Sequence, residues 1–259
     1  MEALAASLSV PPDMMDGFAE VYACQGARGA KNYKALLQKV RSNSEVLKAI
    51  EAMASELPPL DDKAKERLVF CGRYAAKAGT PLDQSLRNAA ADVAAAAATK
   101  AACTDGKLQF AVKAAKFGDE HLACRKAAFP YSPSVSASHG SPVLEARATT
   151  AVSGAVAAGE LLGYVAMEGG GYVDDIGVFP KFHGQGVASG LLAACAKTGG
   201  PTLSLDVRAA NVPAIKLYTH LGFQFGELGF PGFLDWDGGL DGQADSRAVL
   251  AKKPASCQI

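Results

Sequence analysis

The sequence feature that most constrains the fold is a strand-like run that passes through a glycine-bearing turn into a helix. The strand-like run covers residues 172–178, Gly184 and Gly186 lie in the turn, and Val187 and Leu191 follow at helical spacing. The first N–H groups of a helix have no partner within it, and the helix dipole adds partial positive charge there. The segment therefore predicts a cradle for a pyrophosphate group.

This turn lacks the two common phosphate-binding motifs in their full form. It is neither a Walker loop nor the G-x-G-x-x-G fingerprint of dinucleotide-binding folds. A G-x-G turn alone is a weak signal, because it also fits a purely structural turn. The interpretation therefore depends on a second segment further along the chain.

The second segment, residues 203–223, reads as a strand followed by a capped helix. Asn211 is a good N-cap, Pro213 is tolerated in the first helical turn, and Gly222 ends the helix. Tyr218 follows Asn211 by two helical turns, so we expect both on the same side of the helix.

Together the two segments resemble the GNAT superfamily of N-acetyltransferases. The phosphate-binding pattern of that family is Q/R-x-x-G-x-G/A, and residues 183–188 match it at both small positions, with His183 in place of Gln or Arg. The family's later pattern, N-x-x-A-x-x-x-Y-x-x-x-G-F, is matched at every position by Asn211, Ala214, Tyr218, Gly222 and Phe223. The resemblance extends over about residues 107–254 and implies an acetyl-CoA-dependent N-acetyltransferase domain there.

The resemblance also implies a role for each residue of the two motifs. The end of the first strand would bond the pantetheine arm of acetyl-CoA through its backbone, and the glycine turn would hold the pyrophosphate. Asn211 would contact the cofactor near its thioester, and Tyr218 would give a proton to the departing thiolate. The residues so assigned to the cofactor are Ile176, Gly177, Val178, His183, Gly184, Gln185, Gly186, Val187, Ala188, Ser189 and Asn211.

A general base is also expected, since an amine is mostly protonated at neutral pH and must lose a proton before it attacks. Asp206 occupies the position of the proposed base in ribosomal-protein alanine N-acetyltransferases, whose L-E-V-R segment resembles L-D-V-R here. Strand alternation places Asp206 opposite the apolar side chains of 203–207. Asp174 or Asp175, acting through a water, remains an alternative. Direct transfer requires no metal and no covalent intermediate, and Cys195 falls on the buried face of its helix.

The rest of residues 107–254 reads as strands mixed with helices. We expect a strand over 108–112, a helix over 117–128, a Pro/Ser/Gly loop over 130–142, and a hairpin formed by 151–158 and 161–167. Further along, a strand over 202–207 precedes a helix over 212–221. This pattern predicts an α/β or layered α+β fold, a GNAT-like mixed sheet flanked by helices.

Residues 1–104 read as an all-helical region that the resemblance does not cover. Helices are predicted over 31–57, 63–79 and 81–103, and Thr104-Asp105-Gly106 is the predicted boundary. This region fits a structural extension, which we favour, or a small bundle for docking a partner or forming an oligomer.

Composition excludes several function classes. Lys and Arg number 26, as do Asp and Glu, so the formal net charge is +0, and we expect neither nucleic-acid nor membrane binding. The acidic start is unlike a secretory or transit peptide, and the alanine-rich tract 89–103 is too weakly hydrophobic to span a bilayer. Six scattered cysteines suggest reduced thiols, and hence a cytoplasmic protein without a metal site.

The sequence thus predicts an enzyme that transfers acetyl from acetyl-CoA to a primary amine. The acceptor is left open among a protein N-terminus, a lysine and a small amine. The alternative is a non-catalytic relative that binds acyl-CoA and serves as a scaffold or assembly subunit.

Overall fold

The computed structural model describes residues 2–3, 48–49, 51–53, 68, 81–103, 107–129, 139–198, 202–208, 211–225 and 245–251. The chain divides into two compact units, residues 87–203 and residues 1–86 with 204–259. Apart from a few helical positions, the helices predicted over 31–57 and 63–79 lie outside the described residues. The boundary predicted at 104–106 also lies outside them and stays a prediction.

The unit of residues 87–203 is built on four strands that lie side by side in chain order and are antiparallel throughout. They are β1 (Phe110–Lys116), β2 (Pro142–Ala148), β3 (Leu161–Glu168) and β4 (Tyr172–Val178). The pairing register places Lys113 opposite Glu145 and Tyr164 opposite Gly177. Each of these two pairs lies beside a point where a helix is fastened to the sheet.

The predicted hairpin is wrong in its first strand. Residues 151–158 contain only an isolated bridge between Val152 and Val156, and β3 pairs instead with β2. Gly154 and Gly159 adopt φ of +72° and +80°, so this small-residue run turns rather than extends. The real strand carries Glu145, a charged residue that is buried through its ion pairs, and the sequence pattern alone does not indicate that burial.

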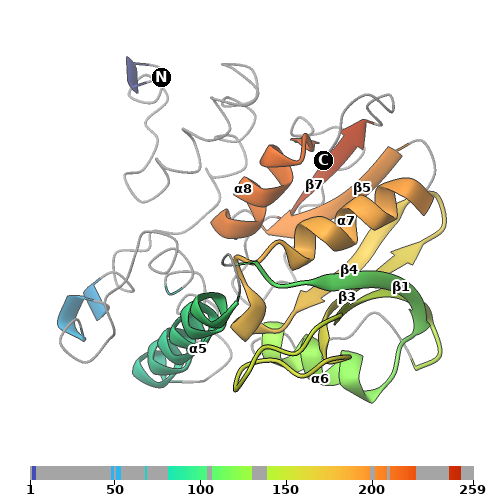
Figure 1. Ribbon diagram of the computed structural model, residues 1–259. Coiled ribbons are helices and arrows are strands. Elements are labelled where there is room, and N and C mark those ends of the chain that lie inside the picture. The colour runs from blue at the N-terminus through green and yellow to red at the C-terminus, as the bar shows by residue number, and fades with distance from the viewer. Residues whose placement is uncertain are drawn as a thin grey trace. The chain divides into compact units, whose positions relative to one another are not determined.

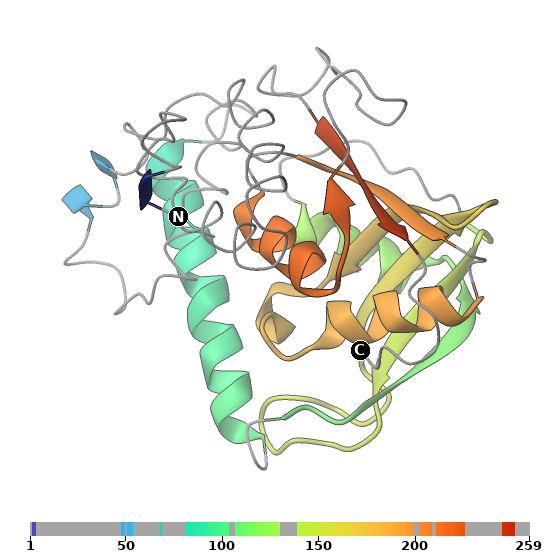
Figure 2. The ribbon, with the colours of Figure 1, turned by 90° about the horizontal axis from the view of Figure 1, so that it is seen from above.

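Two helices cover opposite faces of the four strands (Figure 1, Figure 2). Helix α6 (Asp119–Ala128) contacts β3 and β4, whereas α7 (Val187–Thr198) contacts all four strands. The buried cluster on the α6 side is formed by Phe117, Cys124, Val143, Leu161, Tyr164 and Ala166. Helix α7 buries Val187, Leu191, Leu192 and Cys195, which confirms the buried face predicted for it.

Helix α5 (Leu82–Ala102) confirms the helix predicted after Pro81. Its buried positions from residue 87 onward are Ala89, Ala90 and Thr99, and Cys103 is buried directly after its end. Ala89 and Ala90 contribute little apolar area at these buried positions.

The remaining elements are β5 (Thr202–Arg208), α8 (Val212–His220), β6 (Gln224–Phe225) and β7 (Asp245–Ala251). β6 and β7 pair antiparallel. Leu203, Leu205 and Val207 are all buried, which confirms the alternation predicted for β5. The fold is thus α/β, a mixed sheet with flanking helices preceded by a helix, as the sequence predicts. None of the described helices is long and apolar enough to cross a membrane.

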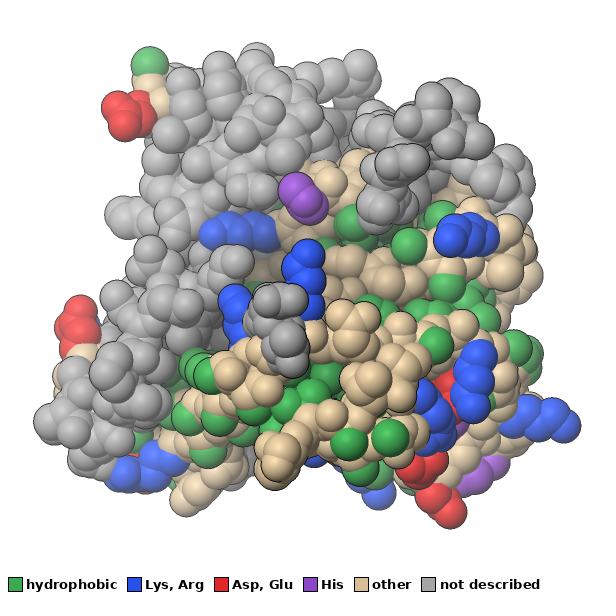
Figure 3. Space-filling view, viewed as in Figure 1, with side chains coloured by type: hydrophobic (Ala, Val, Ile, Leu, Met, Phe, Trp, Pro, Cys, Tyr) green, Lys and Arg blue, Asp and Glu red, His purple; other side chains and the backbone are tan. Residues whose placement is uncertain are grey.

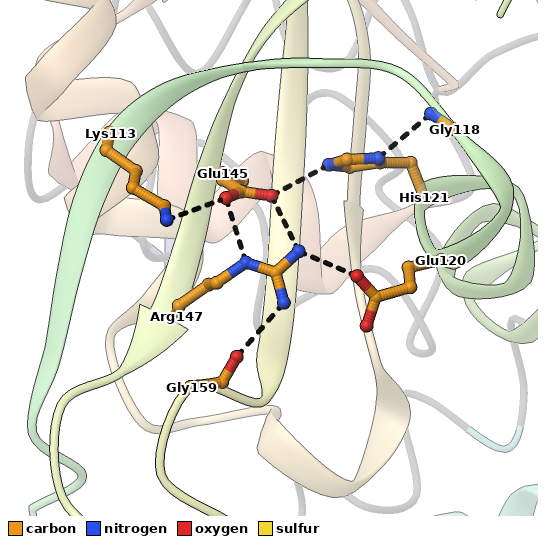
Figure 4. A network of polar contacts seen from close by, with 7 residues as sticks. All are labelled: Lys113, Gly118, Glu120, His121, Glu145, Arg147 and Gly159. Carbon is orange, nitrogen blue, oxygen red and sulfur yellow. Dashed lines mark hydrogen bonds and ion pairs between the residues drawn. The ribbon is translucent and has the colours of Figure 1, made fainter.

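A buried carboxylate fastens α6 to the sheet (Figure 4). Both oxygens of Glu145 on β2 accept hydrogen bonds from Arg147, at 2.8 and 2.9 Å, and Lys113 Nζ on β1 lies 3.4 Å away. Arg147 also donates to Glu120 on α6 at 2.7 Å. The guanidinium therefore joins the strand to the helix through two carboxylates.

His121 completes this network from the first turn of α6 (Figure 4). Its Nδ1 accepts the Gly118 N–H at 3.1 Å, so a neutral ring carries its proton on Nε2, which lies 3.2 Å from Glu145 Oε2. One imidazole thus satisfies an amide at the start of the helix and faces the carboxylate of the sheet.

The network also sets the pKa of its acids. Burial tends to raise the pKa of Glu145, but the hydrogen bond and charge of Arg147, together with Lys113, outweigh burial and hold that pKa below its ordinary value. The Arg147 hydrogen bond likewise lowers the pKa of Glu120.

We predict that Glu145→Gln lowers the free energy of unfolding by about 2 kcal/mol at neutral pH, because charged hydrogen bonds are lost. An acid whose pKa is lower in the folded state than in the unfolded state stabilises the fold at any pH above its unfolded pKa, which is 4.5 for Glu145. This stabilisation is lost as the pH falls through the folded pKa. Urea unfolding between about pH 5 and pH 3 should therefore show a shallower acid loss in Glu145→Gln than in the wild type. The exposed Glu168→Gln serves as control, and a wild-type pH slope in Glu145→Gln would contradict this account.

Close packing of α7 on β1 depends on a glycine. A Cβ added at Gly190 would lie 2.7 Å from Phe110 Cε2 and 2.9 Å from Cζ, well inside van der Waals contact. The aromatic ring of β1 therefore occupies the space that any other residue would need.

We predict that Gly190→Ala destabilises the fold by about 1–3 kcal/mol, even though alanine favours a helix by about 1 kcal/mol, because the ring must move. Gly169→Ala is the matched control, since its added Cβ would meet nothing within 4 Å. Equal free energies of unfolding of the two variants in urea would contradict this prediction and show that the Phe110 ring moves aside without loss of stability.

Candidate active site

The turn between β4 and α7 has the geometry of an anion cradle. A short 3-10 helix, η3 (Pro180–Phe182), leads from the strand into the turn. Gly184 and Gly186 then adopt φ of +74° and +81°, a left-handed conformation that residues with a side chain rarely adopt. An added Cβ at either glycine would meet no described atom within 4 Å, so this side of the turn is open.

The backbone of the turn presents free donors. The Gly190 N–H donates to Gly186 O at 2.9 Å and opens the hydrogen-bond ladder of α7. Within the part of the chain that the structure describes, the N–H groups of residues 184–189 have no partner in the protein. These amides lie at the positive end of the helix dipole, which favours an anionic ligand.

His183 holds the turn against the strand that precedes it. Its Nε2 donates to Val178 O at the end of β4, at 3.0 Å, and its N–H donates to Pro180 O at 3.1 Å. The family pattern has Gln or Arg at this position. In this chain the imidazole serves to position the turn, and its role toward a cofactor stays a prediction.

The side chains of Lys181 and Gln185 also restrain the turn. Lys181 Nζ donates to Glu160 Oε1 at 2.5 Å, and the other oxygen of Glu160 accepts the Ala157 N–H. Gln185 Nε2 donates to Lys181 O at 3.5 Å, and its Oε1 accepts from Cys103 Sγ at 3.7 Å. No sequence motif marks Glu160 or Cys103, because both act through contacts made only on folding.

The predicted pantetheine strand, Ile176 to Val178, lies in close contact with β3. A Cβ at Gly177 would lie 2.9 Å from Tyr164 Cε1, and one at Gly163 would lie 2.6 Å from Gly177 O. Both glycines are therefore required by strand packing. The cofactor contacts predicted for Ile176, Gly177 and Val178 stay predictions.

Asp175, one of the candidate bases, lies in a buried cluster on the α6 side. Tyr164 OH donates to its Oδ2 at 2.6 Å, and Arg125 Nε lies 2.9 Å from the same oxygen. Burial raises the pKa of Asp175, with Arg125 opposing that shift, and burial together with the Asp175 charge raises the pKa of Tyr164. Asp174 is only half-buried, as expected for the neighbouring residue of a strand.

The residues of the second motif lie on β5 and α8. Asn211 is the N-cap of α8, its Oδ1 accepts the Ala214 N–H at 3.3 Å, and this confirms the predicted cap. Tyr218 is 6% exposed, and its ring centroid lies 5.4 Å from that of Phe223. Asp206 lies on β5, but its side chain is outside the described residues.

Among the described residues, neither a reactive cysteine at position 195 nor a metal-binding cluster is indicated. Burial raises the pKa of the Cys195 thiol to about 12, which disfavours the reactive thiolate. No group of three or more His, Cys, Asp or Glu among the described residues could hold a metal ion. On the face seen in Figure 3, Lys and Arg side chains lie in several separate places rather than in one broad patch of the described surface.

Comparison with known proteins identifies the family of this region. The model of the acetyltransferase (GNAT) family matches residues 115–223, while no curated protein matches the chain. Fourteen chains of solved structures match.

Three of these structures are acetyltransferases by description. Nourseothricin acetyltransferase is 25% identical over 43% of this chain and 65% of its own length, with a TM-score of 0.34. The ribosomal-protein-S18-alanine N-acetyltransferase of Escherichia coli is 21% identical over 57% of this chain and 99% of its own, with a TM-score of 0.39. A GCN5-related N-acetyltransferase of Rhodopseudomonas palustris, also described as a class-II aminotransferase, is 15% identical over 75% and 92%, with a TM-score of 0.32.

The matched region includes β2 to β5, α6 to α8, the glycine turn and the Asn211–Phe223 motif. The enzymes of this family use an acyl-CoA, and the open amides of the turn suit its phosphates. Residues 115–223 of this chain are a GNAT acetyltransferase domain.

Proposed function

We propose that the protein transfers the acetyl group of acetyl-CoA to a primary amine by direct attack in a ternary complex. The observation that carries this proposal is the turn from β4 into α7. Its unpaired N–H groups at residues 184–189, with open space at Gly184 and Gly186, suit the pyrophosphate of coenzyme A.

In this mechanism the amine nitrogen attacks the thioester carbonyl carbon, the C–N bond forms and the C–S bond breaks. The proton that the amine loses passes to Asp206, and Tyr218 supplies a proton to the sulfur that leaves. A thiol has a pKa of about 8.5, so protonation by Tyr218 assists departure without being indispensable. Cys195 takes no part, because it is fully buried in α7.

We favour Asp206 over Asp175 as the base because Asp175 is already engaged. Its Oδ2 bonds Tyr164 and lies beside Arg125, so proton uptake there would weaken a buried ion pair. Asp174 is the remaining alternative. Loss of turnover in Asp206→Asn but not in Asp174→Asn would support the assignment, and the opposite result would reverse it.

For the acceptor we favour a protein N-terminus over a lysine or a small amine. The support is the run Leu205-Asp206-Val207-Arg208, which resembles the corresponding segment of ribosomal-protein alanine N-acetyltransferases. In this proposal residues 1–104 are a helical region that precedes the acetyltransferase domain, and the domain covers about residues 107–254.

The direct test is calorimetry with acetyl-CoA, followed by a thiol-release screen over peptides with free N-termini, lysine peptides and polyamines. We predict binding of acetyl-CoA and thiol release with at least one amine class. No binding would contradict the proposal. Binding without turnover of any amine would instead favour a non-catalytic scaffold that binds acyl-CoA.

We predict that Tyr218→Phe lowers kcat at least about tenfold while the Kd for acetyl-CoA changes less than about twofold, because the hydroxyl acts only on the leaving sulfur. Tyr172→Phe on β4 is the matched control and should keep its turnover. An unchanged kcat in Tyr218→Phe would remove Tyr218 from the mechanism and leave it as a packing partner of Phe223.

A further inference from the structure

Cys103 contacts the glycine turn from outside the matched family region. Cys103, directly after α5, is buried, and its Sγ lies 3.7 Å from Gln185 Oε1 in the turn and 3.2 Å from Thr99 O in α5. A thiol is a weak donor with one proton, which these two acceptors share. Thr99, Cys103 and Gln185 belong to one compact unit, although Cys103 and Gln185 are 82 positions apart in the sequence.

The side-chain amide of Gln185 is restrained through both its oxygen and its nitrogen. Its Oε1 accepts from Cys103, and its Nε2 donates to Lys181 O at 3.5 Å. Gly184 and Gly186 on either side have no side chains, so neither can restrain the turn by packing. Glycine also loses the most backbone freedom on ordering, so a turn of this kind gains from an external restraint.

Hydrogen bonds of Thr99 hold the end of α5, and Cys103 with it, in place. It is 4% exposed, and its hydroxyl donates to Ala95 O at 2.9 Å, while its carbonyl accepts from Cys103. The Cys103 thiol thus lies between the Thr99 carbonyl at the end of α5 and the Gln185 side chain in the turn.

From these contacts we infer that the C-terminal end of α5, through Cys103 and Gln185, positions the cofactor-binding turn. Cys103 is a positioning residue and touches neither the acetyl group nor the amine. The inference rests on the proposed function in one respect, since it assigns the positioned turn to coenzyme A. It also gives residues 81–103 a role beyond that of a passive extension.

The test is a double-mutant cycle read by coenzyme A affinity. Calorimetry with coenzyme A should show a Kd raised about three- to tenfold in Cys103→Ala and in Gln185→Ala, because an ordered contact is lost before binding. The double variant should bind no more weakly than Gln185→Ala alone, since both changes remove the same interaction. Cys103→Ser keeps a donor and should bind as the wild type does.

Cys195→Ala is the matched control, because Cys195 is also a buried free cysteine but lies on the buried face of α7 rather than at the end of α5. It should lower stability without raising the Kd for coenzyme A. Wild-type affinity in Cys103→Ala, or additive losses in the double variant, would overturn the inference.

A second readout separates this inference from the proposed function. Amide hydrogen exchange of a peptide covering residues 180–192 should speed up in Cys103→Ala without any ligand, and should not in Cys195→Ala. If the wild type fails to bind coenzyme A, the proposed function fails, yet faster exchange would still uphold the positioning contact. Unchanged exchange in Cys103→Ala would refute it.

Discussion

The chain reversal between β4 and α7 is the constraint around which the described unit is arranged. Two left-handed glycines let the backbone turn sharply enough for its N–H groups to converge at the start of a helix. Such a turn is intrinsically loose, and the structure restrains it from three directions. His183 bonds the strand end, Lys181 bonds Glu160, and Gln185 contacts Cys103.

Close packing at glycines and an ion-pair network hold the strands and helices of the unit together. Gly163 and Gly177 allow β3 and β4 to approach closely, and Gly190 allows α7 to pack closely on Phe110 of β1. On the other face, Glu145 and Arg147 fasten α6 to the sheet through a network in which each carboxylate has a cationic partner. A buried acid of this kind is tolerable only while its partners remain.

Two acidic residues that look equivalent in the sequence differ in the fold. Asp174 and Asp175 are adjacent, but only Asp175 is fully buried, where Tyr164 and Arg125 engage it. This ion pair joins α6 to β4 and explains why a carboxylate is held inside the sheet layer. Which of the two carboxylates is buried depends on which face of β4 packs against α6, and the sequence of β4 alone does not indicate that face.

The sequence predicted the elements whose signals are local. The cap at Asn211, the alternation of β5, the buried face of α7 and the glycine turn all follow from spacing and backbone preference. The strand β2 was missed because Glu145 and Arg147 look like surface residues, and their burial depends on partners from β1 and α6. The contact of Cys103 with Gln185 joins residues 82 positions apart, so no local pattern could indicate it.

The central claim is that the amides of residues 184–189 receive the phosphates of coenzyme A. Titration of ¹⁵N-labelled protein with coenzyme A, followed by amide chemical shifts, tests it at those atoms. We predict that the largest chemical-shift changes fall on the amides of Gly184, Gly186 and their neighbours up to Ser189, with smaller changes elsewhere. Binding that leaves these amides unmoved, or no change at any amide, would contradict it.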